Sequence, residues 1–317
     1  MKLLWFGLSV LAALAVIVLL IAYICFRMAF YVPRKRPQET EEYPIPDGAI
    51  YEPYRDQMVT WIKEVRSLPH EDLNITSFDG LTLRGKYYEY APGAPIELML
   101  HGYRGNSERD MCGGVQRCFA LKRNALIVDQ RGCGRSDGTV ITFGINEKRD
   151  CLAWVDCLIR RFGPDVEIIL TGISMGAATV MMASGTDLPD NVIGVLADCG
   201  YSSAKEIIKI VIRQMKLPAT LAYPFVKLGA KLYGHFDLEE TSPVEAMRKA
   251  RVPIIFYHGE ADDFVPCSMS KECFDACVAR KAIVTIPGAG HGLSYPKDPE
   301  TYLQTLFDFF GPEASAQ

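Results

Sequence analysis

The chain has 317 residues, of which 49% are apolar and 23% are charged, and its formal net charge is -4. This length leaves room for a membrane segment and one main domain, but not for two large domains as well. Because the net charge is weakly negative and the main domain carries no basic block, we do not expect nucleic acid as a partner.

The first informative feature is an uncharged apolar run from Leu3 to Phe26. About twenty such residues are enough to cross a hydrocarbon core of about 30 Å as a helix. A cleaved signal peptide is one alternative, but its small-residue site at Ala13-Leu14-Ala15 would cut in the middle of the run. A buried core helix is the other, and it would be shorter. We therefore predict a single retained membrane span through residues 3–26.

The charges that flank this run predict its orientation. Only Lys2 and the amino terminus precede it, whereas Arg27, Arg34, Lys35 and Arg36 follow it. The positive-inside rule then places the C-terminal domain in the cytoplasm. Cysteine usage agrees, because the cysteines beyond the run show no paired spacing of the kind that secreted disulfide frameworks have. The sequence contains no Cys-x-x-Cys pair with matching histidines, so we do not expect a structural zinc site.

The next segments lead from the span to the domain. Pro33–Pro53 is rich in proline and glutamate and predicts an extended linker that lifts the domain off the membrane. Apolar residues at helical spacing from Met58 to Val65 predict an amphipathic helix. Two strands, Leu73–Phe78 and Leu81–Tyr90, then flank Asp79-Gly80, which is a strong signal for a two-residue hairpin.

Short apolar runs of about five or six residues then alternate with helical segments. These runs are Ile96–Leu100, Ala125–Asp129, Val166–Thr171, Val192–Ala197, Ile254–Tyr257 and Ala282–Ile286. Continuous apolar runs are typical of strands buried on both faces. The alternation predicts an α/β fold with a mainly parallel sheet, helices on both faces and the hairpin at its edge. Catalytic groups of such sheets lie at the carboxyl ends of the strands.

Residues 199–250 interrupt this alternation with two helix-like stretches, Lys205–Met215 and Tyr223–Tyr233. An insertion of this length is usually functional, so we expect a helical lid over the site. A structural decoration that only protects the sheet is the alternative. The expected division is 1–30 for a transmembrane anchor, 31–55 for the linker, 56–198 and 251–312 for the two parts of the core, and 199–250 for the lid.

A nucleophile motif follows the strand predicted at Val166–Thr171. The residues Gly172-Ile173-Ser174-Met175-Gly176 form a tight turn that leads into a helix of small residues. Glycines are needed at such a turn because a Cβ would clash with the neighbouring backbone. The turn would present the Ser174 hydroxyl above the sheet and direct the Met175 N–H toward a developing oxyanion. An ordinary glycine-rich turn is the alternative, so the choice between the two interpretations depends on whether Ser174 has catalytic partners.

A serine nucleophile needs a base, and the base needs a carboxylate that orients it. His291 lies between glycines directly after the last predicted strand and has no hydrophobic face to fill, so we prefer it to His235 in the insertion. The carboxylate is expected between the serine and the histidine in chain order. Asp262 stands in an Asp-x-x-Val-Pro frame and is our candidate, with the adjacent Asp263 as the alternative.

The second oxyanion donor is expected in the loop after an earlier strand. Ile96–Leu100 leads into His101-Gly102-Tyr103, and we expect the Tyr103 backbone N–H to face Met175. The loop Arg131–Ser136 lacks the third glycine of a dinucleotide fingerprint and the Gly-Lys-Ser/Thr of a P-loop. We interpret it as a tight loop that shapes the rim of the site.

Taken together, five motifs occur in an order that resembles α/β-hydrolases, and in particular their membrane-anchored, serine aminopeptidase-like branch in bacteria. The motifs are His101-Gly102, Asp129–Ser136, Gly172–Gly176, His258-Gly259-x-x-Asp262-x-x-Val265-Pro266 and Gly290-His291-Gly292. The resemblance covers about residues 70–310. It implies a triad of Ser174, Asp262 and His291 and an acyl-enzyme mechanism that needs no cofactor or metal.

The resemblance does not fix the substrate, because the family includes esterases, lipases, thioesterases and peptidases. The apolar span favours a small-molecule or lipid-like acyl ester presented near the membrane. An aminopeptidase of the proline-iminopeptidase type is the alternative, in which Glu239 or Glu240 would hold the free amine of the substrate. A non-catalytic binding protein of the same fold is the third reading.

Overall fold

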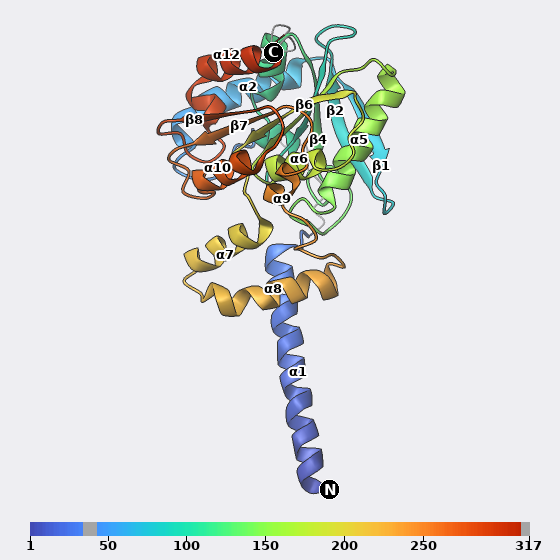
Figure 1. The fold of residues 1–317 in the computed structure, drawn as a ribbon, viewed down its shortest axis with the longest axis vertical. Helices are drawn as coiled ribbons and strands as arrows, with labels where there is room; N and C mark the ends of the chain where they lie inside the picture. The colour runs from blue at the N-terminus through green and yellow to red at the C-terminus, as the bar shows by residue number, and fades with distance from the viewer. Residues whose placement is uncertain (34–42, 312–317) are drawn as a thin grey trace.

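The computed structural model describes residues 1–33 and 43–311. One sheet lies at the centre with helices on both faces, and the long helix α1 projects away from it (Figure 1). The strands are β1 Glu71–Thr76, β2 Thr82–Tyr88, β3 Ile96–Leu100, β4 Asn124–Asp129, β5 Ile168–Ile173, β6 Val192–Asp198, β7 Ile254–Gly259 and β8 Lys281–Ile286. The helices are α1 Lys2–Ala29, α2 Arg55–Ser67, α3 Ser107–Asp110, α4 Gly114–Ala120, α5 Glu147–Phe162, α6 Met175–Ser184, α7 Ala204–Gln214, α8 Ala219–Tyr233, α9 Pro243–Met247, α10 Cys267–Ala276, α11 Ser294–Lys297 and α12 Pro299–Phe310, with a short 3₁₀ turn at Glu52–Tyr54.

The strands are ordered β1-β2-β4-β3-β5-β6-β7-β8. The pairs β1–β2 and β2–β4 are antiparallel, and every other pair is parallel. This confirms the predicted α/β fold with a hairpin at the edge of a mainly parallel sheet. The register aligns Ile173 with Asp198 and Asp198 with Tyr257. The carboxyl ends of β5, β6 and β7 therefore meet at one edge of the sheet.

The core has a layer on each side of the sheet. On one side, Leu98 of β3 and Phe256 of β7 belong to the cluster that contains the buried faces of α5, α6, α9 and α10. On the other side, Met99 packs with residues of α2 and α4, and Tyr257 packs with α12. The continuous apolar runs in the sequence follow from this arrangement, because both faces of each central strand are covered.

The last two turns of α1 are part of the domain. Phe30 is fully buried, and its ring contacts those of Phe143 and Phe236 at centroid distances of 5.7 and 5.2 Å. The chain then pairs with residues 139–141, since the Val32 N–H donates to the Thr139 carbonyl at 2.8 Å. Within the described residues, α1 is the one helix long and apolar enough to cross a membrane.

The predicted linker is only partly described, because residues 34–42 lie outside the described ranges. Its second half does not stand free of the domain. Ile45, Tyr51 and Tyr54 pack against Met58 and Leu293 in a cluster at the carboxyl edge of the sheet. The prolines of this segment predicted a spacer, but its aromatic and aliphatic side chains bury themselves beside the loop that carries His291.

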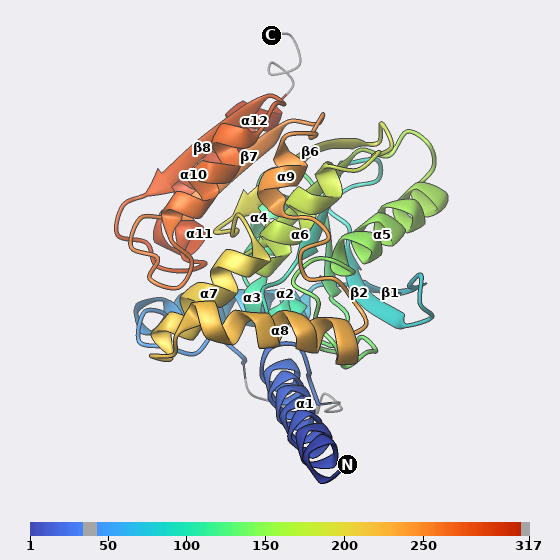
Figure 2. The ribbon, with the colours of Figure 1, turned by 60° about the horizontal axis from the view of Figure 1, so that its bottom comes forward.

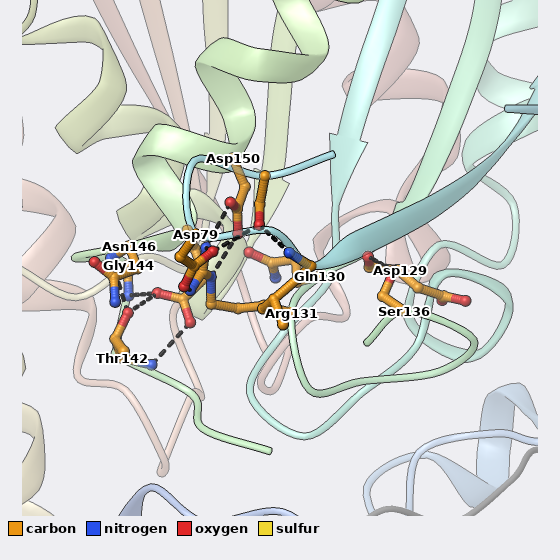
Figure 3. Close-up of polar contacts among 12 residues, drawn as sticks. Asp79, Asp129, Gln130, Arg131, Ser136, Thr142, Gly144, Asn146 and Asp150 are labelled. Carbon is orange, nitrogen blue, oxygen red and sulfur yellow. Dashed lines mark hydrogen bonds and ion pairs between the residues drawn. The ribbon is translucent and has the colours of Figure 1, made fainter. Parts of the chain in front are cut away.

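The loop Arg131–Ser136 is held by a buried polar network (Figure 3). Arg131 donates to both carboxylate oxygens of Asp150 on α5, at 2.6 and 2.7 Å, and to Asp79 of the hairpin turn at 2.9 Å. The Ser136 hydroxyl donates to the Asp129 carbonyl at 2.5 Å. Removing one partner of such a buried pair is strongly destabilising, so the network fixes the hairpin against α5.

Candidate active site

Ser174 lies on a strained turn between β5 and α6. Its φ of 55° and ψ of -116° are rare for a residue that carries a Cβ. The close approach of the flanking backbone explains the two glycines, because a Cβ at Gly172 would collide with the Gly176 backbone, and one at Gly176 would collide with the Leu100 carbonyl. The Ser174 N–H donates to the Asp198 carbonyl at 2.8 Å, which secures the turn to β6.

Three side chains from different loops form one chain of hydrogen bonds. His291 Nε2 lies 2.9 Å from Ser174 Oγ, and His291 Nδ1 lies 2.7 Å from Asp262 Oδ2. Since a carboxylate only accepts, Nδ1 carries the proton toward Asp262, which leaves Nε2 to accept from the serine hydroxyl. The structure therefore brings together Ser174, His291 and Asp262 at the carboxyl edge of the sheet.

Asp262 is held by other groups besides His291. Its Oδ1 accepts the backbone N–H groups of Phe264 and Val265 at 3.0 and 2.8 Å, and His258 Nε2 lies 3.2 Å from Oδ2. Burial alone would raise the pKa of Asp262, but the hydrogen bonds from His258 and His291 outweigh it and hold the pKa well below its ordinary value. Asp263, the alternative candidate, is exposed.

The backbone around Tyr103 is held from both sides. His101 Nε2 accepts the Gln130 N–H at 3.0 Å, so Nδ1 donates to the Gly102 carbonyl at 2.7 Å. The Gly102 N–H donates to Asp110 Oδ2 at 3.0 Å. Because the peptide bond is trans, the Tyr103 N–H points away from His101.

Met175 is the first residue of α6, so its backbone N–H is one that no helical carbonyl can reach. An N–H of this kind at a helix N-terminus is suited to an anion.

The Tyr103 side chain makes a contact that the sequence did not predict. Its hydroxyl donates to the Ala29 carbonyl at 2.7 Å, and the neighbouring Arg104 Nη2 donates to the Met28 carbonyl at 2.8 Å. Burial raises the pKa of Tyr103 to about 12. The loop that would supply the second oxyanion donor is thus tied to the C-terminal end of α1.

A cavity of about 180 Å³ opens at Ser174 and His291. Its other lining residues come mainly from the segments around β3, α3, α4 and the C-terminal loops: Pro46, Tyr51, Met58, Gly102, Tyr103, Arg109, Asp110, Met111, Cys112, Gly114, Arg117, Thr171, Gly172, Ile173, Leu196, Asp198, Phe264, Gly292, Tyr295, Pro296 and Tyr302. An outer hollow of about 510 Å³ shares Pro46, Tyr51, Arg109, Phe264 and His291 with it and continues along residues 46–51.

Two segments that were expected at the rim of the site do not line this cavity. The loop 131–136 and the insertion 199–250 are fully described, and neither contributes a residue to its lining. The loop instead serves the polar network beside α5. Pro46 and Tyr51 contribute to its wall, and the Tyr51 hydroxyl donates to the His291 carbonyl at 3.0 Å. A hydrogen bond from a side chain to a backbone carbonyl 240 residues later in the chain leaves no local pattern in the sequence.

The alternative candidates for the amine-binding carboxylate and for the base do not line the cavity. Glu239 pairs with Lys227 at 2.7 Å, and Glu240 pairs with Lys148 at 2.8 Å. Neither glutamate lines the cavity. His235 is exposed in the insertion.

The described residues contain one group with the chemistry of metal ligands, formed by Cys199, Asp262 and His291, whose ligand atoms lie within 4.8 Å of one another. Burial raises the pKa of the Cys199 thiol well above its ordinary value. Because the thiolate is the metal-binding form, this environment disfavours a thiolate ligand.

Comparisons with known proteins agree with this architecture. YqkD of Bacillus subtilis is 29% identical over 187 residues, which span 59% of this chain and 61% of YqkD. Protein bem46 of Schizosaccharomyces pombe is 24% identical over 77% of both chains. An esterase from Pyrococcus furiosus superposes with a TM-score of 0.66 at 20% identity, over 89% of this chain and 97% of the esterase. Est1E of Butyrivibrio proteoclasticus, solved with ferulic acid, superposes with a TM-score of 0.59 at 20% identity, over 77% of this chain and 100% of Est1E.

At these identities the solved structures establish the fold alone. The sequence itself matches the alpha/beta hydrolase family over residues 98–305, which is more than half of the chain and includes β4 to β8, Ser174, Asp262 and His291. The chain therefore belongs to the alpha/beta hydrolase family and is a hydrolase.

Proposed function

We propose that the protein is a serine hydrolase that cleaves esters through an acyl-enzyme. The observation that carries this proposal is the hydrogen-bonded chain from Ser174 through His291 to Asp262 at the mouth of the cavity. Ser174 Oγ attacks the ester carbonyl while His291 Nε2 takes its proton, and Asp262 stabilises the imidazolium. Collapse of the intermediate expels the alcohol, which receives that proton. Water then attacks the acyl-enzyme by the same route and releases the acid.

The oxyanion of both tetrahedral intermediates is bound by the backbone N–H groups of Met175 and Tyr103. Support comes from the position of Met175 at the start of α6 and from the hydrogen bonds that fix the Gly102–Tyr103 peptide. In other serine hydrolases, removing one such donor costs about 10²- to 10³-fold in rate.

We propose an acyl or lipid-derived substrate and a single membrane span through residues 3–26, with the catalytic domain on the cytoplasmic side. The apolar surface of α1, the cations after it and the apolar rim residues Phe264 and Ile50 support this. An aminopeptidase is less favoured, because the carboxylates expected to hold the amine, Glu239 and Glu240, pair with lysines away from the cavity.

A fluorophosphonate probe tests the proposal on the full chain in detergent. The wild type should be labelled, and Ser174→Ala and His291→Ala should not. Labelling of Ser174→Ala, or no labelling of the wild type, would overturn the assignment of the nucleophile. A series of esters of increasing acyl length then tests the substrate class. Highest activity on acetyl esters, with a steep fall for longer chains, would overturn the lipid-derived substrate.

A further inference from the structure

The outer face of α8 is apolar although it faces away from the protein. Leu217 just before the helix, Leu221 and Leu232 are 49, 69 and 41% exposed. With the half-buried Leu228 they recur at intervals of four and seven residues, which places them on one stripe. The opposite face, with Tyr223 and Val226, is buried in the main core. A helix on the surface of a soluble domain would carry polar residues on this outer stripe.

The helix α8 lies across α1, between the core and the free part of α1 (Figures 1 and 2). At the crossing, Gly229 packs directly on the Ala22 carbonyl. The Tyr233 hydroxyl donates to the Leu19 carbonyl at 3.1 Å, and its ring contacts Phe26 at a centroid distance of 5.9 Å. The contacts of α8 therefore fall on the last apolar turns of α1, and its exposed outer stripe is on the side away from the main core.

The rise of α1 gives the depth of this crossing. At 1.5 Å per residue, a hydrocarbon core of about 30 Å takes about twenty residues, which reach from Leu3 to Ala22. If α1 spans a bilayer, Ala22 lies at the boundary between acyl chains and headgroups. The exposed cations Arg27, Lys216 and Lys231 then lie near the headgroups, where positive side chains are favoured.

The corner between α7 and α8 also touches the candidate site. Gln214 Nε2 donates to the Asp263 carbonyl at 3.3 Å, and Asp263 lines the outer hollow together with Phe264 and Ile50. The exposed side chains of Met215 and Leu217 are next to this contact. Exposed apolar side chains therefore lie on both sides of this contact, Met215 and Leu217 on the insertion and Ile50 and Phe264 at the outer hollow.

We infer that α8 is an interfacial helix whose outer stripe inserts into the acyl chains of the same bilayer that α1 spans, so that an ester lipid reaches the outer hollow without crossing water. The inference rests on the proposed span and, for the delivery of substrate, on the proposed hydrolase activity. Burial of the stripe in lipid removes exposed apolar surface from water, which favours binding in proportion to its area.

Quenching by lipids with brominated acyl chains tests the position of α8 in the full chain in vesicles. If the quenched tryptophan fluorescence is lost in Trp5→Phe, that fluorescence comes from Trp5, and its quenching reports on the span. In that background, Leu221→Trp should restore quenching, whereas the control Phe307→Trp on α12, at the opposite end of the molecule (Figure 1), should not.

Quenching of Trp5 without quenching at residue 221 would overturn the inference alone, including the case in which a second copy of the chain covers the stripe. Absence of quenching at both positions would overturn the span and the inference together. Quenching at residue 221 without quenching of Trp5 would overturn the span and with it the inference in its stated form, and would leave α8 as a membrane-binding helix that acts without the span.

Activity tests the delivery of substrate separately. Leu221→Glu should lower hydrolysis of an ester lipid in vesicles by about tenfold and leave hydrolysis of a water-soluble short ester unchanged. Phe307→Glu should change neither rate. Equal rates for Leu221→Glu and the wild type on the vesicle substrate would overturn the delivery route even if the quenching result holds.

Discussion

The Tyr51 hydroxyl donates a 3.0 Å hydrogen bond to the backbone carbonyl of His291, and so joins the segment before α2 to the histidine loop. Burial raises the pKa of Tyr51 well above its ordinary value, so the hydroxyl stays protonated and remains a donor. We expect Tyr51→Phe to lower kcat/KM for an ester about two- to tenfold, because one such bond contributes about 0.5–1.5 kcal/mol. Steady-state kinetics beside the control Tyr54→Phe measure the effect. Equal values for the two variants would exclude a positioning role for Tyr51.

Asp262 and Asp263 are neighbours in the chain but differ in their partners. Only Asp262 bonds to His291, while Asp263 is exposed. Asp262→Asn should lower kcat by about four orders of magnitude, because the amide favours the wrong tautomer of the histidine. Asp263→Asn should stay within about twofold of the wild type. The reverse order of effects, measured with the same ester, would assign the acid to Asp263.

Glu97 on β3 connects Arg117 and Arg123 through two 2.5 Å contacts inside the protein. Burial alone would raise the pKa of Glu97, but the two guanidinium groups lower it to about 2. A carboxyl with a depressed folded pKa stabilises the protein above its unfolded pKa of about 4.3, and this contribution is lost as the pH falls toward about 2. Stability should therefore decrease through that window.

Glu97→Gln leaves two buried cations without their carboxylate. We expect it to lower the free energy of unfolding at neutral pH by about 3–5 kcal/mol and to flatten the acid dependence. Urea titrations followed by tryptophan fluorescence in detergent measure both, with the exposed Glu272→Gln as the control. An unchanged acid dependence in Glu97→Gln would show that other carboxyls account for it.

Gly229 allows the close crossing of α8 and α1, because a Cβ there would collide with the Ala22 carbonyl. Gly229→Ala should therefore destabilise the protein by about 1–3 kcal/mol despite the better helix propensity of alanine. Gly7→Ala on the free part of α1 meets nothing within 4 Å and should not lower stability. Thermal unfolding in detergent compares the two. A stabilised Gly229→Ala would mean that α8 and α1 do not pack in this way.

Much of the fold could be predicted from the sequence because its signals are local. A strand buried on both faces gives a continuous apolar run, and the predicted run Ile96–Leu100 coincides with β3. In α5, the helical spacing of Leu152, Val155, Ile159 and Phe162 indicates a helix but does not give its buried face. The buried residues include Trp154 and Leu158, and Phe162 is exposed. The sheet, not the spacing alone, decides which side of an apolar helix is covered.

The candidate site also contains residues that the sequence predicts and contacts that it does not predict. Ser174 and His291 were predictable because a strained turn and a loop between glycines leave a pattern in the sequence. The wall at Tyr51 and the link from Tyr103 to Ala29 were not, because each joins a hydroxyl to a backbone carbonyl in a segment far along the chain. Such bonds depend on the packing of the whole molecule, and almost any residue can supply the acceptor.

The burial of Phe30 between Phe143 and Phe236 has a practical consequence for anyone who seeks a detergent-free fragment. A recombinant chain that starts after residue 32 loses the Phe30 ring and the pairing with residues 139–141, and it also loses the contact of Phe26 with Tyr233 of α8. Proteolytic shedding would damage the domain in the same way. The exposed part of α1 is therefore better shortened from its amino terminus, with everything from Ala22 onward retained.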